Sequence, residues 1–223
     1  MNMQHARERS NEGLDAPRTI ALTGAAVAVG AAAALIVLPW LVPALSASIF
    51  APQPKVWWFL VRATGLVAFG LVTLSMTLGL LLSTRLAKSW PGAPAAFAFH
   101  QEASLVGLGL AALHGLLLLG DRHTPFTPLQ VILPFNAPVH PLAVGLGQLA
   151  FFGMGILVAS HYLRRHLGPR IWRGLHGISF AVYLAVVAHG VWVGSDRALV
   201  LFAIAPAFAL MALAGVRIRG AAH

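Results

Sequence analysis

Two apolar stretches decide how this sequence folds: FHQEASLVGLGLAALHG, residues Phe99–Gly115, and WRGLHGISFAVYLAVVAHG, residues Trp172–Gly190. Each is long enough to belong to a membrane-spanning helix and carries two histidines, the four being His100, His114, His176 and His189. A histidine inside a spanning helix is costly and usually functional. The two stretches therefore point to the fold class and to the place of a functional site.

The composition of the whole chain agrees with a membrane protein. Of its 223 residues, 58% are hydrophobic and only 9% are charged, whereas a soluble domain has about 25% charged residues. The net charge of +9 is a topology signal, because the basic residues do not cluster on one polar segment and no nucleic acid is expected as a partner. The absence of cysteine excludes disulfides, cysteine-ligated iron–sulfur clusters and covalent c-type haem.

Six stretches are apolar enough to span a bilayer, for which a helix needs about 20 residues. No run alternates as a barrel strand would, so we predict an all-α polytopic membrane protein with a six-helix transmembrane bundle. The expected helices are Ile20–Trp40, Trp57–Leu82, Ala96–Leu119, Pro141–Leu163, Ile171–Val193 and Ala198–Val216.

The loop cations orient this bundle. Eleven of them fall in the two tails and the second and fourth loops, and three, Lys55, Arg122 and Arg197, fall in the other loops. This asymmetry predicts that both termini are cytoplasmic. We expect a cytoplasmic tail over residues 1–18 rather than a cleaved signal peptide, a transmembrane domain over residues 19–217, and a short cytoplasmic tail over residues 218–223.

The four histidines match in depth under this topology. His100 pairs with His176 near the cytoplasm and His114 with His189 near the outside, since both helices run outward and the separations of 14 and 13 residues rise about 21 and 20 Å. Imidazole is a common iron ligand, so two planar macrocycles ligated from both sides, that is, two haems, suit this arrangement.

The residues between the ligands are small, and one angular mismatch remains. From His100 one face of the helix runs through Ser104, Gly107 and Ala111 to His114, which leaves room for a flat ring. Thirteen residues, however, miss a whole number of turns by about 140°. The helix that carries His176 and His189 is therefore expected to be tilted or locally distorted, or its two rings approach from different sides.

At these residues the sequence resembles the ferric reductase-like transmembrane domain, which ferric-chelate reductases, NADPH oxidases and bacterial b-type cytochromes share. The resemblance covers residues 57–197 and includes RATGLVAFGL, residues Arg62–Leu71, beside the two histidine stretches. It implies two non-covalent haem b groups with bis-histidine ligation and electron flow from the cytoplasmic haem to the outer one. Larger members append a flavin and NAD(P)H domain, whereas we expect no FAD or NAD(P)H site in this chain.

Five arginines are candidate contacts of the cofactor. Arg62 is the sharpest, because it lies about five residues inside a helix, where a cation is costly unless it is paired. We predict that it reaches a propionate of the outer haem or the site where the acceptor is reduced. The other four are Arg122 and Arg197 on the outer side and Arg170 and Arg173 on the inner side; interface anchoring or the positive-inside rule would also account for these.

These observations predict a subunit that carries electrons across a prokaryotic inner membrane through two haems and that forms part of an oxidoreductase. The donor would be another protein or a quinol, and the outer acceptor a small molecule or a periplasmic oxidoreductase. One alternative is a quinol-linked cytochrome b that serves a partner enzyme. Another is a non-redox accessory subunit or a metal transporter, which is disfavoured because Glu102 is the one acid inside an expected span.

Overall fold

The computed structural model describes residues 55–88, 92–122 and 124–194, together with Ile204, Ala205, Phe208 and Ala212. The chain divides into two compact units, Met1–Val56 and Trp57–His223, and the site described below belongs to the second. The helix expected at Ile20–Trp40 lies outside the described residues. So does the helix expected at Ala198–Val216, apart from four isolated helical positions.

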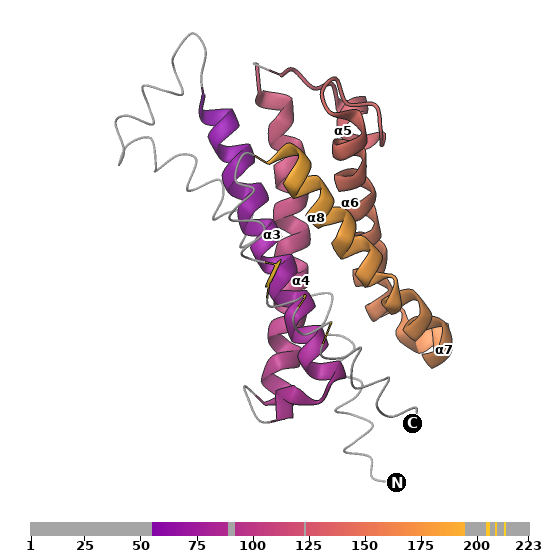
Figure 1. Cartoon of the computed structure of the whole chain (residues 1–223). Helices are drawn as coiled ribbons and strands as arrows, with labels where there is room; N and C mark the ends of the chain where they lie inside the picture. The colour runs from indigo at the N-terminus through magenta and orange to yellow at the C-terminus, as the bar shows by residue number, and fades with distance from the viewer. Residues whose placement is uncertain are drawn as a thin grey trace, which may run out of the picture. The chain divides into compact units, whose positions relative to one another are not determined.

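Over the described residues the chain is all-α (Figure 1). Its elements in chain order are α3 (Val56–Ser83), η1 (Leu86–Lys88), α4 (Ala93–Leu117), η2 (Leu118–Gly120), α5 (Pro128–Ile132), α6 (Pro141–Tyr162), α7 (Arg164–Gly177) and α8 (Ser179–Val193).

Four helices in this part of the chain are long and apolar enough to cross a membrane: Val56–Ser83, Ala93–Gly120, Pro141–Tyr162 and Arg164–Val193. They coincide with the second to fifth helices expected from the sequence, with ends shifted by at most three residues except that the last begins at Arg164, seven residues before the expected Ile171. The prediction of an all-α chain with several candidate membrane spans is confirmed to that extent.

Prolines mark where most of these helices begin. Proline suits the first turn of a helix because its missing N–H would have no intrahelical partner there. Pro94 lies in the first turn of α4, and Pro128 and Pro141 open α5 and α6. Within α7, Gly168 adopts a φ of 75° just before Pro169. The regular helix that carries His176 therefore begins at Pro169.

A break at Ile178 separates α7 from α8. The Ile178 N–H donates to the carbonyl of Leu175, three residues back, at 3.0 Å, which is the tighter 3₁₀ pattern. His176 lies before the break and His189 after it. A local distortion, one of the three outcomes that the 13-residue spacing left open, is therefore present between the two histidines.

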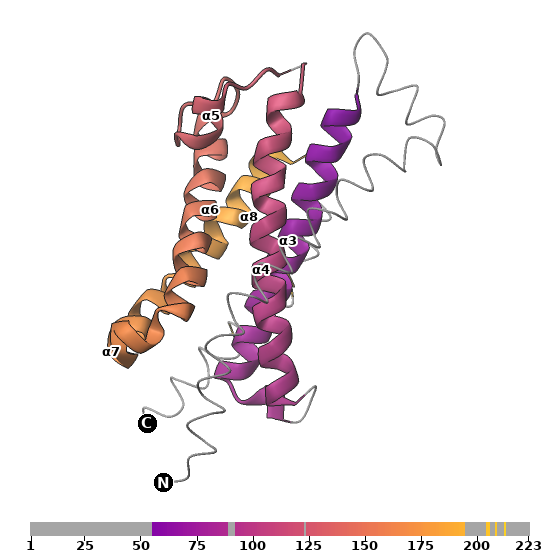
Figure 2. The same cartoon turned by 180° about the vertical axis from the view of Figure 1, so that it is seen from behind.

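The helices pack in two antiparallel pairs, α3 against α4 and α6 against α8. In the two opposite views of Figures 1 and 2, α3 and α4 run side by side, joined by the hydrogen bond between Ser75 and Ser104. In the same views α8 crosses obliquely beside α6, which also contacts α4. Gly107 makes the α3–α4 approach close, since a β carbon there would stand 3.3 Å from a methyl of Val72. Small residues at such contacts are typical of membrane helices.

Two small apolar clusters close the ends of the bundle. Leu78, Ala87 and Ala96 pack where α3 turns into α4, and Phe126, Ala137 and Val144 pack beneath α5. The connection between α4 and α6 contains the short helix α5. A capping box formed by Thr127 and Gln130 stabilises the start of that helix. Gln148 links α6 to α5 by donating hydrogen bonds from Nε2 to the carbonyls of Gln130 and Val131, at 2.8 and 2.7 Å.

Candidate functional site

The structure brings the four histidines together as two pairs, the same pairs that the depth argument predicts. The ring centroids of His100 on α4 and His176 on α7 lie 6.2 Å apart, with an angle of 77° between the ring planes. Those of His114 on α4 and His189 on α8 lie 6.3 Å apart, at 82°. The two pairs are therefore nearly equivalent in geometry.

This separation suits a metal ion between the rings. An imidazole nitrogen binds a metal at about 2.0–2.1 Å and lies roughly 1.1 Å from its ring centre, so ligation from opposite sides places the centroids about 6.3 Å apart. Edge-to-face packing of aromatic rings covers the same range. Ring separation alone does not distinguish the two, and the orientation of the rings is the stronger observation.

Three of the four rings are turned so that Nδ1 faces a neighbouring backbone. The Nδ1 atoms of His100, His114 and His189 lie 2.8, 2.7 and 2.8 Å from the carbonyl oxygens of Ser75, Val61 and Ala143. A carbonyl only accepts, so each Nδ1 carries the proton and donates it, which leaves Nε2 as a lone-pair donor for a metal. A second partner of this kind is a general feature of metal-binding histidines, because it fixes the ring and its tautomer.

Glycines on α3 and α6 make room for these rings. A β carbon at Gly65 would stand 2.8 Å from Nδ1 of His114, and one at Gly147 would stand 2.6 Å from Nδ1 of His189. At Gly79 it would stand 3.3 Å from Cε1 of His100. Each of the three rings therefore lies against bare backbone and has little freedom to move away from its partner.

The fourth ring, that of His176, is held by an aromatic residue. Trp172, one turn earlier on α7, stacks on it with centroids 5.1 Å apart and planes at 20°. The indole N–H of Trp172 is buried and has no hydrogen-bond partner within the described part of the chain. A buried donor without a partner is costly, so this N–H is an observation in favour of a polar group of a bound cofactor beside the His100–His176 pair.

Neither pair gains a third protein ligand from the described residues, where no group of three or more histidine, cysteine or acidic side chains is arranged to hold a metal ion. Protein-bound metal ions generally take four to six ligands. A metal held by either pair would therefore need further ligands from beyond the described residues, which a planar tetradentate macrocycle would supply. The donor set fits a bis-histidine haem better than a bare ion.

The small residues between the ligands have a use that differs in part from the prediction. Ser104 and Gly107 face α3: the Ser104 hydroxyl lies 2.7 Å from that of Ser75, and Gly107 meets the side chain of Val72. Gly115 faces Val131 near α5, while a β carbon at Gly177 would meet nothing within 4 Å. Of the residues expected to leave room for a ring between His100 and His114, Ser104 and Gly107 therefore pack against α3 instead.

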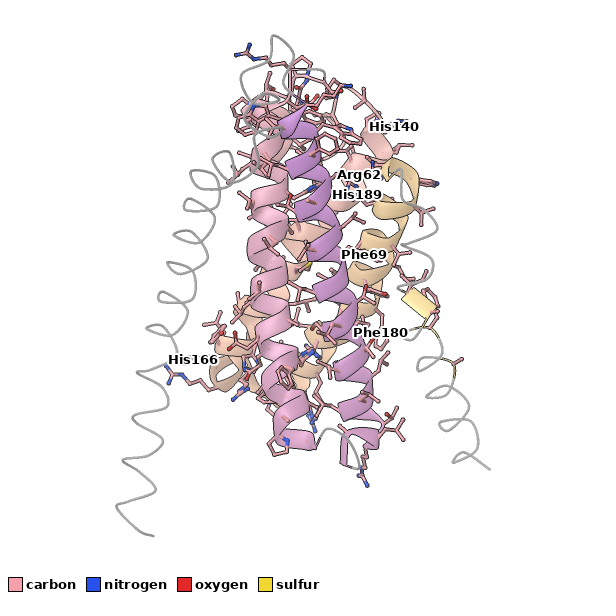
Figure 3. All side chains as sticks on the ribbon, turned by 90° about the vertical axis from the view of Figure 1, so that its left-hand side faces the viewer. Arg62, Phe69, His140, His166, Phe180 and His189 are labelled. Carbon is pink, nitrogen blue, oxygen red and sulfur yellow. The ribbon has the colours of Figure 1, made fainter. Side chains whose placement is uncertain are left out.

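The candidate arginines divide between the two ends of the bundle. Arg62, half-buried on α3, follows Val61, whose carbonyl holds His114, and its Cζ lies 4.9 Å from the centre of the Trp58 ring. In Figure 3, Arg62 and His189 lie at one level. Arg122 is exposed after η2, Arg170 and Arg173 are exposed on α7, and Arg197 lies outside the described residues.

Sequence reasoning missed the residues that position the ligands, namely Gly65, Ser75 and Gly79 on α3 and Gly147 on α6. One signal was present. Gly65 and Gly79 are 14 residues apart, as are His100 and His114, and antiparallel helices bring the two sets into register. The carbonyl partners carry no such signal, because every residue has a carbonyl group.

Comparison with protein-family models, with curated proteins and with solved structures found no match.

Proposed function

We propose that this chain is a transmembrane electron-transfer subunit that holds two haem b groups, one between His100 and His176 and the other between His114 and His189. The observation that carries the proposal is the repetition of one arrangement at two depths: ring centroids 6.2 and 6.3 Å apart, on neighbouring apolar helices. The resemblance to the ferric reductase-like transmembrane domain points the same way.

The two haems would supply one-electron redox centres stacked across the membrane. His100 and His114 lie about 21 Å apart along α4, against a hydrocarbon core about 30 Å thick. Two centres at these depths divide the crossing into short steps. The chain itself would fix their spacing, through the rigid helix that carries both histidines.

The protein surroundings would set the properties of each centre. The Nδ1–H donors to Ser75, Val61 and Ala143 keep the imidazoles in one tautomer and raise the basicity of Nε2. The packed glycines hold the rings in place, so little reorganisation accompanies a change of charge. Both features suit electron transfer, which is fast when the ligands move little.

The proposal includes the topology and the partners expected from the sequence. The bundle would have six spans with both termini in the cytoplasm, so that the α7 end faces the cytoplasm and the α5 end faces outward. Electrons would enter at the His100–His176 pair from a protein or a quinol. They would leave at the His114–His189 pair to a small molecule or a periplasmic oxidoreductase, which makes the chain one component of an oxidoreductase in a prokaryotic inner membrane.

A spectroscopic measurement on the purified full-length protein tests this proposal. We expect two b-type haems per chain, released by acid solvent because they are not covalently bound, and a two-step redox titration. Replacing either His114 or His189 with leucine should remove one centre, and replacing either His100 or His176 should remove the other. His166→Leu is the matched control, since His166 is exposed on α7 and bonds to its neighbour Arg165. A protein without haem after haem-replete expression would refute the proposal.

A further inference from the structure

A second polar cluster lies beside the His100–His176 pair and is not needed to hold it. It is formed by Gln101 and Glu102 of α4, His161 and Tyr162 of α6, and Arg164 at the start of α7; we call it the Gln101–His161 cluster. Gln101 Nε2 lies 2.8 Å from His161 Nε2, and Arg164 Nη1 lies 3.1 Å from the same atom. Glu102 interacts electrostatically with Tyr162 across the boundary between the two helices.

The position of His161 relates this cluster to the site. His161 follows Gly147 by 14 residues on α6, so it approaches the His100–His176 pair on nearly the same helix face on which Gly147 meets His189. Gln101, whose Nε2 lies 2.8 Å from His161 Nε2, directly follows His100 on α4. On α6, Gly147 therefore lies beside the His114–His189 pair, and the imidazole of His161 lies on nearly the same face toward the His100–His176 end.

The hydrogen bonds of His161 indicate the protonation state of its imidazole. Both of its polar neighbours, the amide nitrogen of Gln101 and the guanidinium of Arg164, are N–H donors. The imidazole therefore accepts from them and is held in its neutral form, which is able to take up a proton. Phe97 adds an aromatic wall, with its ring centre 6.1 Å from that of His161.

The cluster opens onto the apolar surface of the helices. Glu102, Phe97 and Tyr162 are exposed, although they belong to helices of spanning length. Glu102 stands nine residues into α4, about 14 Å along its axis. Glu102 is thus an exposed acid within a helix of spanning length, and acids in such helices usually mark a functional site.

We propose that the Gln101–His161 cluster binds the head group of a lipid-soluble hydroquinone, which would be the electron donor of the His100–His176 pair. This inference rests on the proposed function, because it needs a redox centre between those histidines. A hydroquinone presents two hydroxyl groups and an apolar ring. Here one hydroxyl takes the place of the Gln101 amide as the donor to His161 Nε2, the Glu102 carboxylate accepts from the other hydroxyl, and Phe97 packs against the ring.

The cluster can account for every electron and proton that a hydroquinone releases. Oxidation of a hydroquinone to a quinone releases two electrons and two protons. The electrons pass one at a time toward the His100–His176 pair, and with each electron an O–H proton passes to His161 and then to water beside Arg164, which is exposed. No other oxidant is required, because the outer acceptor of the proposed function receives both electrons.

The test compares two reductants on the haem-loaded full-length protein. A short-tailed benzohydroquinone needs the cluster, whereas dithionite does not. In His161→Leu we expect reduction by the hydroquinone to slow by about 100-fold, as is usual when a proton acceptor is lost, while dithionite reduction and haem content stay unchanged. Glu102→Gln should show a smaller loss. His166→Leu is the control, because it removes an exposed histidine at the same end of the bundle (Figure 3).

A binding measurement gives a readout other than turnover. A photoreactive azidoquinone should label peptides that contain Gln101 or His161, in the presence and in the absence of haem, and excess hydroquinone should prevent the labelling. If dithionite reduces both haems but the hydroquinone reduces neither, or if only a reduced soluble flavoprotein does, the inference is overturned and the proposed function stands. Labelling elsewhere, or an unchanged hydroquinone rate in His161→Leu, also overturns it. Absence of haem would instead refute the proposed function.

Discussion

Gly147 on α6 lies directly against the imidazole of His189 on α8, and a β carbon at that glycine would stand 2.6 Å from Nδ1. No real β carbon tolerates that distance, so the ring or the helix would have to move. This contact gives a way to displace one proposed ligand without changing any histidine.

The first prediction concerns Gly147→Ala. The methyl group should push the His189 ring off α6, break its bond to the Ala143 carbonyl and spoil its alignment with His114, so affinity for the outer haem should fall by about 10- to 100-fold, as for other losses of support around a metal ligand. Haem content per chain and the outer redox step report this loss. Gly155→Ala on the same helix is the control, because its β carbon would meet nothing within 4 Å; equal losses in both variants would contradict the role assigned to Gly147.

The second prediction compares alanine substitutions at three glycines of α3 that lie at different distances from the histidine rings. A β carbon would stand 2.8 Å from the His114 ring at Gly65 but 3.3 Å from the His100 ring at Gly79. Gly65→Ala should therefore lose the outer haem, whereas Gly79→Ala should keep the inner haem with a shifted potential or spectrum. Gly70→Ala, which has open space, should match the wild type. Redox titration of the three variants separates these outcomes, and the reverse order of severity would count against the packing argument.

The third prediction concerns the hydroxyl group of Ser75. Its Oγ lies 3.0 Å from Nδ1 of His100 and 2.7 Å from the hydroxyl of Ser104, while the Ser75 carbonyl also accepts from Nδ1. Ser75→Ala keeps the carbonyl, so the inner haem should remain bound. With one acceptor fewer, the imidazole becomes less basic, and the potential of the inner centre should rise by tens of millivolts. Ser83→Ala is the control, since within the described part of the chain that hydroxyl bonds only to the Leu80 carbonyl of α3.

The fourth prediction returns to Arg62. Loss of a half-buried cation near the His114–His189 pair should destabilise the reduced, more electron-rich state of the outer centre. Arg62→Leu should therefore lower its potential by about 30–60 mV, which corresponds to roughly 1 kcal/mol. Arg165→Leu, at the α7 end, should leave that potential unchanged. Identical titration curves and identical rates of acceptor reduction for Arg62→Leu and the wild type would exclude the role.

The sequence alone predicted the four described spans and the two histidine pairs. It could do so because both depend on properties that sequence carries directly. Apolar runs of sufficient length become helices in a bilayer, and helical rise converts the spacing of His100 and His114 into depth. The same spacing indicated that the helix with His176 would be tilted or distorted, or that its two rings would approach from different sides, but it did not place a break at Ile178.

Tertiary structure alone decided how each ring is held. The carbonyls of Val61, Ser75 and Ala143 have no sequence signature, and Gly65, Gly79 and Gly147 resemble any other glycine of a membrane helix until a ring lies against them. The Gln101–His161 cluster exists only because α4 and α6 meet. Sequence determines which residues can ligate and at what depth; the packing of neighbouring helices determines which atom of each ring faces its partner, because that choice depends on contacts between segments far apart in the chain.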